Sequence, residues 1–412
     1  VEMLNLKRKN TATFALSHPV LRVLQSIKRG LLEIALPNGV RIICEGAENG
    51  PQANIEIRDF SILDRIISHG DIGLGEGYVL RQWDTRNLKT LMQLLAHNYD
   101  VLQSQAHGMV VYKILYAFRH KLRPNSRKGS RKNIHTHYDL GNDFYSLWLD
   151  ETFTYSSALF EGDETKSLEV AQKAKYQRIL NRIDPSPSDH ILEIGCGWGG
   201  LMEQAAKRGC HVTGVTISTA QAKFAQEHLR KECLDHLANV QLQDYREVSQ
   251  QFDHIVSIGM MEHVGEKYWP EYMANIYDCL RPGGKAMIQT IVIQDSLFDD
   301  YRKSSDFIRE HIFPGGMLPS PRRIKEEAKK ANLKVCDIFP FGVDYAITLE
   351  KWLARFDDRV CDIMALGYSD DFIRKWRFYL TSCAAMFRAG KIDVLQVELT
   401  KPNNRDAMKN SH

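Results

Sequence analysis

ILEIGCGWGG, residues 191–200, indicates the architecture of this chain more clearly than any other stretch. An apolar run carries a carboxylate, Glu193, and then breaks into a glycine-rich turn. Glycines let the backbone turn sharply and approach a ligand that a Cβ atom would exclude. Gly195, Gly197 and Gly200 have the G-x-G-x-x-G spacing of a dinucleotide site, but Glu193 and the glycines also fit a pattern used for S-adenosylmethionine (SAM). The residues after the turn have to distinguish these two cofactors.

The next predicted strand, residues 211–217, lacks what a dinucleotide site needs. Such a site has an acidic residue at the end of this strand to bind the ribose. Here the strand ends near Thr216, and no Asp or Glu follows before Glu227, inside a predicted helix. SAM has no pyrophosphate, and its amino acid and ribose need carboxylate and amide partners, which Glu193 and Gln221 supply. The sequence therefore favours SAM, with Thr216 and Gln221 among the cofactor residues.

Strands and helices alternate through the C-terminal two thirds of the chain. This alternation predicts an α/β fold, a doubly wound Rossmann-like parallel sheet of the class I SAM methyltransferase type. Residues 394–400, VLQVELT, are expected as a late antiparallel edge strand. The predicted strands are residues 191–195, 211–217, 240–244, 252–259 and 285–293, and the predicted helices between them are 201–209, 218–233 and 271–280.

The first part of the chain has a different pattern, that of a small α+β domain over residues 1–122. Residues 31–46, with a Pro-Asn-Gly turn, predict a hairpin, and residues 52–60 predict another strand. Residues 59–70 predict a helix that Gly70 ends, and a second helix is expected from about Asn87 to Asn98.

A strongly basic segment follows, because residues 101–138 hold eight Lys or Arg and no Asp or Glu. Residues 109–122 have the periodicity of an amphipathic helix, and 123–134 predict a basic linker before a methyltransferase domain at 135–401 and a polar tail at 402–412. A cationic amphipathic segment suits an anionic phospholipid bilayer. The sequence lacks the signatures of nucleic-acid-binding modules, so no nucleic acid is expected as a partner. A homodimer is left open.

Targeting and metal-binding patterns are not expected. No apolar run reaches the ~18–20 residues of a membrane span, and the first residues lack the apolar core of a signal peptide. The eight cysteines form no C-x-x-C pair, and the loosely spaced His135, His137 and Asp139 are interpreted as a segment that covers the cofactor, so no metal is expected. These features predict a cytoplasmic protein that associates peripherally with the inner face of the membrane.

Residues 135–400 resemble the cyclopropane fatty acid synthase family, which includes the mycolic acid cyclopropane synthases. The N-terminal GDIGLGEGYV resembles the extra domain of the bacterial members that act on phospholipids, so the resemblance favours a phospholipid substrate. The matching stretches are HYDLGNDFYSLWLDETFTYSSALF (137–160), ILEIGCGWGG, VTISTAQ (215–221), LQDYREV (242–248), SIGMMEHVG (257–265), IFPGGMLPS (312–320), FGVDYAITLEKW (341–352) and CAAMFRAGKIDVLQ (383–396).

The resemblance implies methyl transfer from SAM to a cis double bond of a fatty acyl chain. The product cation then loses a proton from the new methyl group to a base, which is a bound bicarbonate in the family, and a cyclopropane ring closes. The alternatives are a methyl or methylene branch, or a methylated diene on the way to a furan fatty acid. A small-molecule SAM methyltransferase and a catalytically silent lipid-binding protein are further alternatives.

The family's functional positions carry over residue by residue. Glu262, Tyr345 and Ile291 match its glutamate, tyrosine and isoleucine, whereas Ser157 replaces its cysteine and Gln289 its histidine. An amide donates a hydrogen bond but carries neither a proton for transfer nor a charge, so the two replacements weaken the expectation of bicarbonate. His263 is interpreted as a core or loop histidine. The residues expected at the cofactor are Tyr155, Ser156, Glu193, Gly195, Gly197, Thr216, Gln221, Tyr245 and Arg246.

Overall fold

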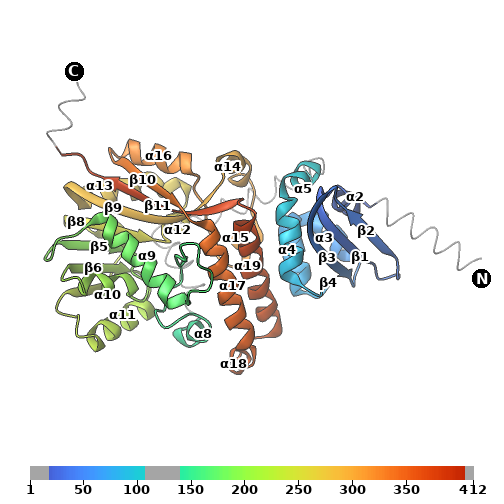
Figure 1. The fold of residues 1–412 in the computed structure, drawn as a ribbon, viewed down its shortest axis with the longest axis horizontal. Helices are drawn as coiled ribbons and strands as arrows, with labels where there is room; N and C mark the ends of the chain where they lie inside the picture. The colour runs from blue at the N-terminus through green and yellow to red at the C-terminus, as the bar shows by residue number, and fades with distance from the viewer. Residues whose placement is uncertain (1–17, 107–139, 404–412) are drawn as a thin grey trace, which may run out of the picture. The chain divides into compact units, whose positions relative to one another are not determined.

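The computed structural model describes residues 18–106 and 140–403, and they form two compact units (Figure 1). Residues 18–106, 303–312 and 364–391 make the first unit, and the rest of the described chain makes the second. The predicted helix 109–122, the basic linker 123–134, the triplet His135, His137 and Asp139, and the tail from 404 lie outside the described residues.

The first unit contains a four-stranded sheet in the order β2-β1-β3-β4. The predicted hairpin is confirmed: β1 and β2 pair antiparallel, with Ile34 opposite Ile42, and the N–H of Leu36 donates to Val40 O across the turn. β3 pairs parallel to β1, and β4 closes the other side. The strands are β1 (Arg29–Ala35), β2 (Arg41–Glu45), β3 (Glu48–Ile57) and β4 (Trp83–Asp84).

The helices of this unit confirm one sequence expectation and extend another. α4 lies where it was predicted, with the Asn87 side chain accepting from Thr90 N as its N-cap. Gly70, with φ +57°, interrupts α3 at the predicted residue, but the chain then returns to helix up to Val79. The glycines of this second half permit close packing, since a Cβ on Gly75 would lie 2.3 Å from the Phe307 ring. The helices are α2 (Pro19–Leu24), α3 (Ser61–Val79), α4 (Leu88–His97), α5 (Tyr99–Ala106), α15 (Phe307–His311) and α19 (Asp370–Arg388).

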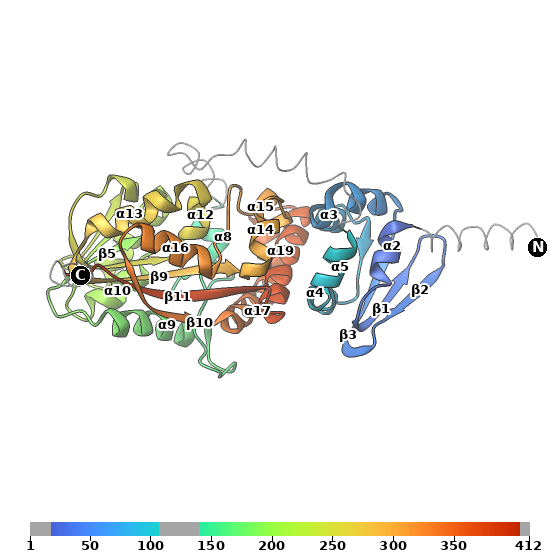
Figure 2. The same ribbon diagram turned by 90° about the horizontal axis from the view of Figure 1, so that it is seen from above.

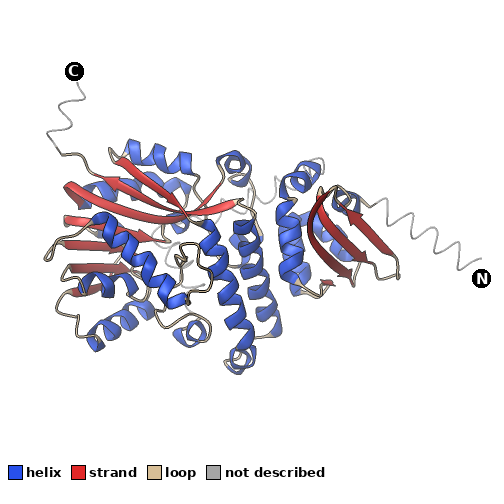
Figure 3. Cartoon of the chain, in the orientation of Figure 1, coloured by secondary structure: helices blue, strands red, loops and turns tan. Residues whose placement is uncertain are grey.

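The second unit is the predicted doubly wound sheet, with seven strands in the order β10-β11-β9-β8-β5-β6-β7 (Figure 3). β5 to β9 are parallel, with Glu193 opposite Gly214 and Val256, and the β8–β9 pair has a register shift between Phe252 and His254. The strands are β5 (His190–Ile194), β6 (His211–Thr216), β7 (Ala238–Leu242), β8 (Phe252–Ile258), β9 (Leu280–Ile293), β10 (Lys334–Pro340) and β11 (Ile392–Thr400).

The prediction that VLQVELT forms the edge strand is wrong. This segment, β11, is antiparallel as expected, but it lies between β9 and β10, and β10 is the edge. Residues 394–399 are all buried, as in a strand with neighbours on both sides, whereas the side chains of β10 are half-buried or exposed. The position of β11 has a consequence at the site, because it places Gln396 opposite Gln289 of β9.

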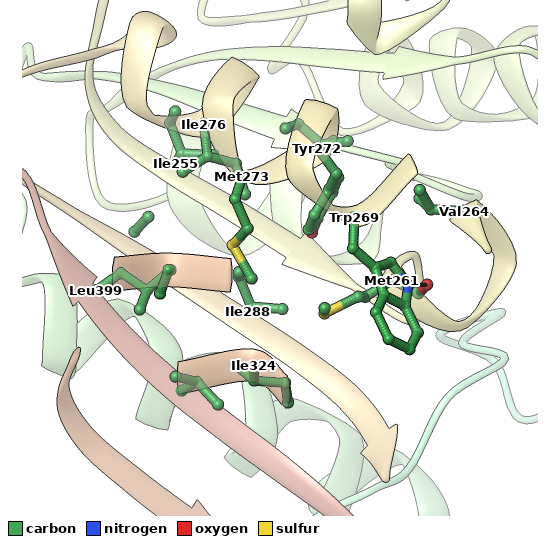
Figure 4. Packing of buried hydrophobic residues seen from close by; sticks show 14 of the residues in the cluster. Ile255, Met261, Val264, Trp269, Tyr272, Met273, Ile276, Ile288, Ile324 and Leu399 are labelled. Carbon is green, nitrogen blue, oxygen red and sulfur yellow. Dashed lines mark hydrogen bonds between the residues drawn. The ribbon is translucent and has the colours of Figure 1, made fainter. Parts of the chain in front are cut away.

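Helices cover both faces of this sheet (Figure 2): α13 and α16 lie on one face, and α9 and α10 on the other. The apolar core is divided in the same way. The α13 side packs Tyr272, Met273 and Ile276 against Ile255 and Ile288 (Figure 4). The helices are α8 (Asn142–Ser146), α9 (Leu168–Ile183), α10 (Gly200–Ala206), α11 (Thr219–Lys231), α12 (Met261–Val264), α13 (Trp269–Cys279), α14 (Asp295–Tyr301), α16 (Pro321–Lys330) and α17 (Gly342–Asp358), and α18 (Val360–Ala365) leads back to the first unit.

No helix among the described residues combines the length and apolar character that a membrane crossing requires.

Candidate active site

The glycine-rich turn joins β5 to α10 at the carboxyl end of the parallel strands. Gly195 and Gly197 have φ of +78° and +53°, a conformation that residues with a Cβ rarely adopt. The N–H groups of Gly195 and Cys196 both donate to Val215 O on β6, at 2.9 and 3.1 Å. A Cβ on Gly195 would lie 2.4 Å from Sδ of Met260, whereas a Cβ on Gly197 would meet nothing within 4 Å. The turn is therefore packed on one side and open at Gly197.

Glu193 lies just before the turn and is 3% exposed. Burial raises the pKa of its carboxyl well above the usual range, and Lys175 opposes this shift. Its Oε2 atom is enclosed and has no hydrogen-bond partner within the described chain. An acceptor without a partner beside an open turn fits the ammonium and hydroxyl donors of SAM.

Thr216 and Gln221 meet at the end of the second strand of the parallel set. The hydroxyl of Thr216 donates to Oε1 of Gln221 at 3.0 Å. Ser218 caps α11 by accepting from the backbone N of Gln221, so Gln221 is held in the first turn of the helix. Because its Oε1 is bonded to Thr216, Gln221 presents its amide Nε2 as the donor for an acceptor such as the carboxylate of SAM.

Tyr155 and Ser156 are held by aromatic rings and by α9. The Tyr155 ring lies 5.4 and 5.3 Å from the rings of Trp148 and Trp352. The backbone oxygen of Ser156 accepts from Nε2 of Gln172 at 2.9 Å, and its hydroxyl accepts from Nζ of Lys175 at 2.8 Å. The segment is thus fixed from both sides, with a buried amine beneath it.

Lys175 is a component of this site that the sequence reasoning missed. It is fully buried on α9, where it also donates to Oε1 of Gln172 at 2.8 Å, and burial lowers its pKa to about 7. The sequence does hold a signal. Ala171 and Ile179, four residues before and after Lys175, are buried, so the lysine occupies a position that helical periodicity assigns to the core.

Tyr245 and Arg246 form a short 3₁₀ turn, η1 (Tyr245–Glu247), beyond the end of β7. The guanidinium of Arg246 donates to both carboxylate oxygens of Asp244, at 2.9 and 2.6 Å. The Tyr245 ring is buried and meets the ring of Tyr272 edge-on, with centroids 5.7 Å apart. Both side chains lie at the carboxyl edge of the sheet, with Tyr245 packed into the core.

Glu262 lies on α12, immediately after β8, and its carboxylate is buried. Oε2 accepts from the hydroxyl of Thr290 at 2.8 Å, and Oε1 accepts from the backbone N of Ile291 at 3.0 Å. Burial raises the pKa of this carboxyl, and the bond from Ile291 opposes the rise. The turn of α12 is fixed by Trp269, whose Nε1 donates to Met261 O at 3.1 Å (Figure 4). The structure therefore brings two predicted site residues, Glu262 and Ile291, into direct contact.

Gln289 lies on β9, two residues before Ile291, and is 2% exposed. Its backbone oxygen accepts from Gly259 N at 2.8 Å, at the carboxyl end of β8. Its Oε1 accepts from Nε2 of Gln396 at 3.1 Å. Gln289 and Ile291 are on the same face of the strand, because side chains alternate along it.

The segments that carry Ser157 and Tyr345 are linked by a hydrogen bond between their neighbours. Ser157 is fully buried, and its hydroxyl donates to Ala158 O at 2.9 Å. The N–H of Ala158 donates to Oγ1 of Thr348 at 3.0 Å, one turn beyond Tyr345 on α17. Tyr345 is 8% exposed, with its ring edge-on to Trp352. His263, by contrast, packs against the Phe313 ring, and burial lowers its pKa to about 4.

Comparison with known proteins assigns the chain to a family. The family model for mycolic acid cyclopropane synthetase matches residues 125–397. The chain is 36% identical to tuberculostearic acid methyltransferase UfaA1 of Mycobacterium tuberculosis over 84% of this chain and 82% of that protein. It is also 36% identical to cyclopropane-fatty-acyl-phospholipid synthase of Escherichia coli, over 85% and 88%.

A solved structure supports the same assignment. The mycolic acid cyclopropane synthase CmaA1, complexed with SAH and CTAB, is 33% identical, with a TM-score of 0.62 over 66% of this chain and 98% of that one. The described side chains fit the cofactor that this family uses, through the open turn at Gly197 and the partnerless Oε2 of Glu193. The chain belongs to the mycolic acid cyclopropane synthetase family and is a SAM-dependent methyltransferase.

Proposed function

We propose that this enzyme methylates the cis double bond of unsaturated acyl chains in membrane phospholipids and forms a cyclopropane. The observation that carries the proposal is the buried Glu262 carboxylate, bonded to Thr290 and Ile291. Glu262 lies two residues after Met260, and the sulfur of Met260 packs against the glycine-rich turn at Gly195. A carboxylate and the methyl donor therefore share one end of the sheet, where ligands of this fold bind.

The chemistry requires that a developing positive charge be stabilised and a proton be removed. Glu193, Gly197 and Gln221 would hold SAM, which would supply an electrophilic methyl group and leave as S-adenosylhomocysteine. Addition of that methyl group to one alkene carbon would leave a cation on the other. Glu262 stabilises the cation electrostatically and receives the proton of the new methyl directly or through a bound base, after which the ring closes. Tyr345 adds an aromatic ring that attracts a cation.

Bicarbonate fits the described side chains less well than SAM does. In this chain the Ser157 hydroxyl already donates to Ala158 O, and the N–H of Ile291 already donates to Glu262. The donor that replaces the family's histidine is the amide of Gln289. We therefore derive no step through bicarbonate and treat it as a variable of the experiments.

The phospholipid substrate is supported by the extent of the similarity. The E. coli relative, named as acting on fatty acyl phospholipids, matches 85% of this chain, whereas the mycolic acid enzyme CmaA1 covers 66%.

We propose residues 1–122 as a lipid-associated domain, 123–134 as a basic linker, 135–401 as the methyltransferase domain and 402–412 as a tail. A branched product is the alternative, because the relative UfaA1 is named a methyltransferase and not a cyclopropane synthase.

Mass spectrometry of lipids decides between these products. The chain is expressed with labelled methionine in cells that make cis-monounsaturated phospholipids but have no enzyme of this kind. The expected product gains one CH₂ and loses the chemical reactivity of an alkene. A product that gains CH₂ and keeps the alkene would establish the branch, and labelling confined to small molecules would refute the lipid substrate.

We also propose that the basic residues of 101–138 bind an anionic membrane surface at the inner face of the membrane. Each Lys or Arg near such a surface contributes about 1 kcal/mol. Neutralising Arg127, Lys128, Arg131 and Lys132 should weaken binding to anionic vesicles, with a salt dependence. Equal binding to neutral vesicles would contradict the proposal. Light scattering on the same preparations distinguishes a monomer from a homodimer.

A further inference from the structure

Three polar side chains from three separate elements form a continuous hydrogen-bonded row. Arg178 on α9 donates from Nη1 to Oε1 of Gln396 at 2.5 Å. Gln396 on β11 donates from Nε2 to Oε1 of Gln289 at 3.1 Å. The two glutamines are directly opposite in the β9–β11 register, and both are buried, with exposures of 1% and 2%.

The chemistry of Arg178 fixes the polarity of the whole row. A guanidinium has donors and no acceptor, so Gln396 has to turn its oxygen towards Arg178 and its Nε2 towards Gln289. Gln289 then has to turn its own oxygen towards Gln396. This leaves the Nε2 group of Gln289 as a donor, and no residue of the described chain accepts from it. The orientation of each amide therefore follows from its donor and acceptor groups.

Arg178 is itself held in place by β10, the edge strand. Its Cζ lies 3.8 Å from the centroid of the Phe339 ring, and its Nη2 lies 3.5 Å from the carboxylate of Asp337. A stacked and paired guanidinium has little freedom to leave Gln396. The edge strand β10 thus supplies the outermost support of the row.

We propose that Arg178 and Gln396 are positioning residues, which hold Gln289 so that its Nε2 group is a fixed, non-titrating donor to the anionic base that takes up the proton at the reaction centre. This inference rests on the proposed function. It adds a role for Gln289, the residue that stands where the family has a histidine. Gln289 lies two residues before Ile291, whose backbone N–H binds Glu262, so the donor and the backbone group that holds the catalytic carboxylate are on one short segment of β9. An amide donor binds an anionic oxygen without changing its charge with pH.

Variants that change the donor and acceptor directions of the Arg178–Gln396–Gln289 hydrogen bonds test the proposal. Gln396→Glu keeps its partner Arg178 but has no donor, so Gln289 has to turn its Nε2 towards the new carboxylate. The turnover number should fall about 10²-fold, as on loss of one fixed hydrogen-bond donor at a reaction centre, while the KM for SAM stays within about twofold. Arg178→Met leaves Gln396 free to adopt both orientations, so the turnover number should fall only about two- to tenfold.

Two controls separate positioning from a general structural effect. Arg182→Met removes the neighbouring arginine of α9, which binds Glu398 on the same strand, and leaves the row intact. Its turnover number should stay within about twofold of wild type. In a Gln289→Leu background there is no amide to orient, so adding Arg178→Met should cause no further loss. Urea unfolding of every variant checks that the protein is folded.

The outcomes separate the two proposals. Positioning is supported if the loss of turnover decreases from Gln396→Glu to Arg178→Met to Arg182→Met. It also requires that the double variant shows no added loss. Equal losses for Arg178→Met and Arg182→Met, or a full further loss in the Gln289→Leu background, would overturn it. Wild-type protein that methylates no lipid in the same assay would refute the proposed function instead.

Discussion

The glycine-rich turn at 193–200 and the proposed reaction centre around Glu262 and Gln289 lie at the same end of one sheet but are built differently. The turn is made of backbone: Gly195 and Gly197 have positive φ, and its N–H groups bond to the adjacent strand. The reaction centre is made of side chains whose partners come from elsewhere in the chain, such as Gln289 and Gln396, 107 residues apart. Local residue types determine the first, and tertiary register determines the second.

A substitution in the proposed reaction centre should lower turnover and leave SAM binding at the turn intact. Glu262→Gln tests this and should cause the largest loss of turnover. The amide still accepts from the N–H of Ile291 and donates to the Thr290 hydroxyl, so the fold is preserved. It has no charge to stabilise a cation and takes no proton. The turnover number should fall by about 10²–10³-fold, with unchanged SAM affinity in calorimetry.

The matched control for this prediction is Glu327→Gln. Glu327 is a buried carboxylate of the same domain, 1% exposed on α16, where it pairs with Arg323 and Lys330. Its substitution should lower stability and leave the turnover number of the folded protein unchanged. Full activity in Glu262→Gln would eliminate the proposed role of Glu262.

Breaking the turn should do the reverse, and Gly197→Ala is the sharpest variant. Its φ of +53° costs an alanine about 1 kcal/mol of stability, and its Cβ would project into open space. If SAM occupies that space, the dissociation constant should rise about tenfold or more. Gly209→Ala is the control, since its φ is +84° and the nearest atom to a Cβ is 3.8 Å away, outside the site. Equal SAM affinity in both variants would mean that the cofactor does not approach Gly197.

The same contrast explains what the sequence could predict. The turn and the alternation of strands and helices depend on residues close in sequence, so pattern reasoning found them. Ile291 and Glu262 were found as separate positions, but their hydrogen bond depends on how α12 folds over β9. The neighbour of Gln289 was not predictable, because VLQVELT shows by its pattern that it is a strand but not which strands flank it. Lys175 was missed because a lysine on a helix is normally exposed.

Lys175 connects the two regions, because it lies on the same helix as Arg178 and supports Ser156. Its folded pKa is about 7, against 10.5 for an ordinary lysine, since burial disfavours the charge. Between these values the unfolded chain binds more protons, so the stability that Lys175 contributes rises with pH from about 7 and is lost as pH falls through about 7. Urea midpoints at pH 7 and 9 should therefore rise more with pH in wild type than in Lys175→Met.

Lys173→Met on the same helix is the control for that measurement. Lys173 is exposed, so its substitution should change the unfolding free energy by less than about 0.5 kcal/mol and leave the pH dependence of wild type intact. A Lys175→Met variant with the same pH dependence as wild type would mean that Lys175 keeps its charge on folding.

Gln289→His has the smallest expected effect and tests the reaction centre most specifically. A neutral imidazole accepts from Gln396 through one nitrogen and donates through the other, so it reproduces the polarity of Gln289 and should retain activity within about tenfold of wild type. A protonated imidazole has no acceptor for Gln396, and burial also disfavours the charge, so the pKa of the new histidine should lie below its ordinary value.

The rate of the variant should fall as pH drops through that lowered pKa, whereas wild type has no such limb from this position. Rate profiles from pH 5.5 to 8.5, with and without added bicarbonate, measure both effects. A stronger response to bicarbonate in Gln289→His would mean that a histidine here recruits the base and that the glutamine of this chain works with less of it. Identical profiles for the two proteins would mean that the side chain at 289 does not face the reacting atoms, and the contrast between turn and centre would then rest on Glu262 alone.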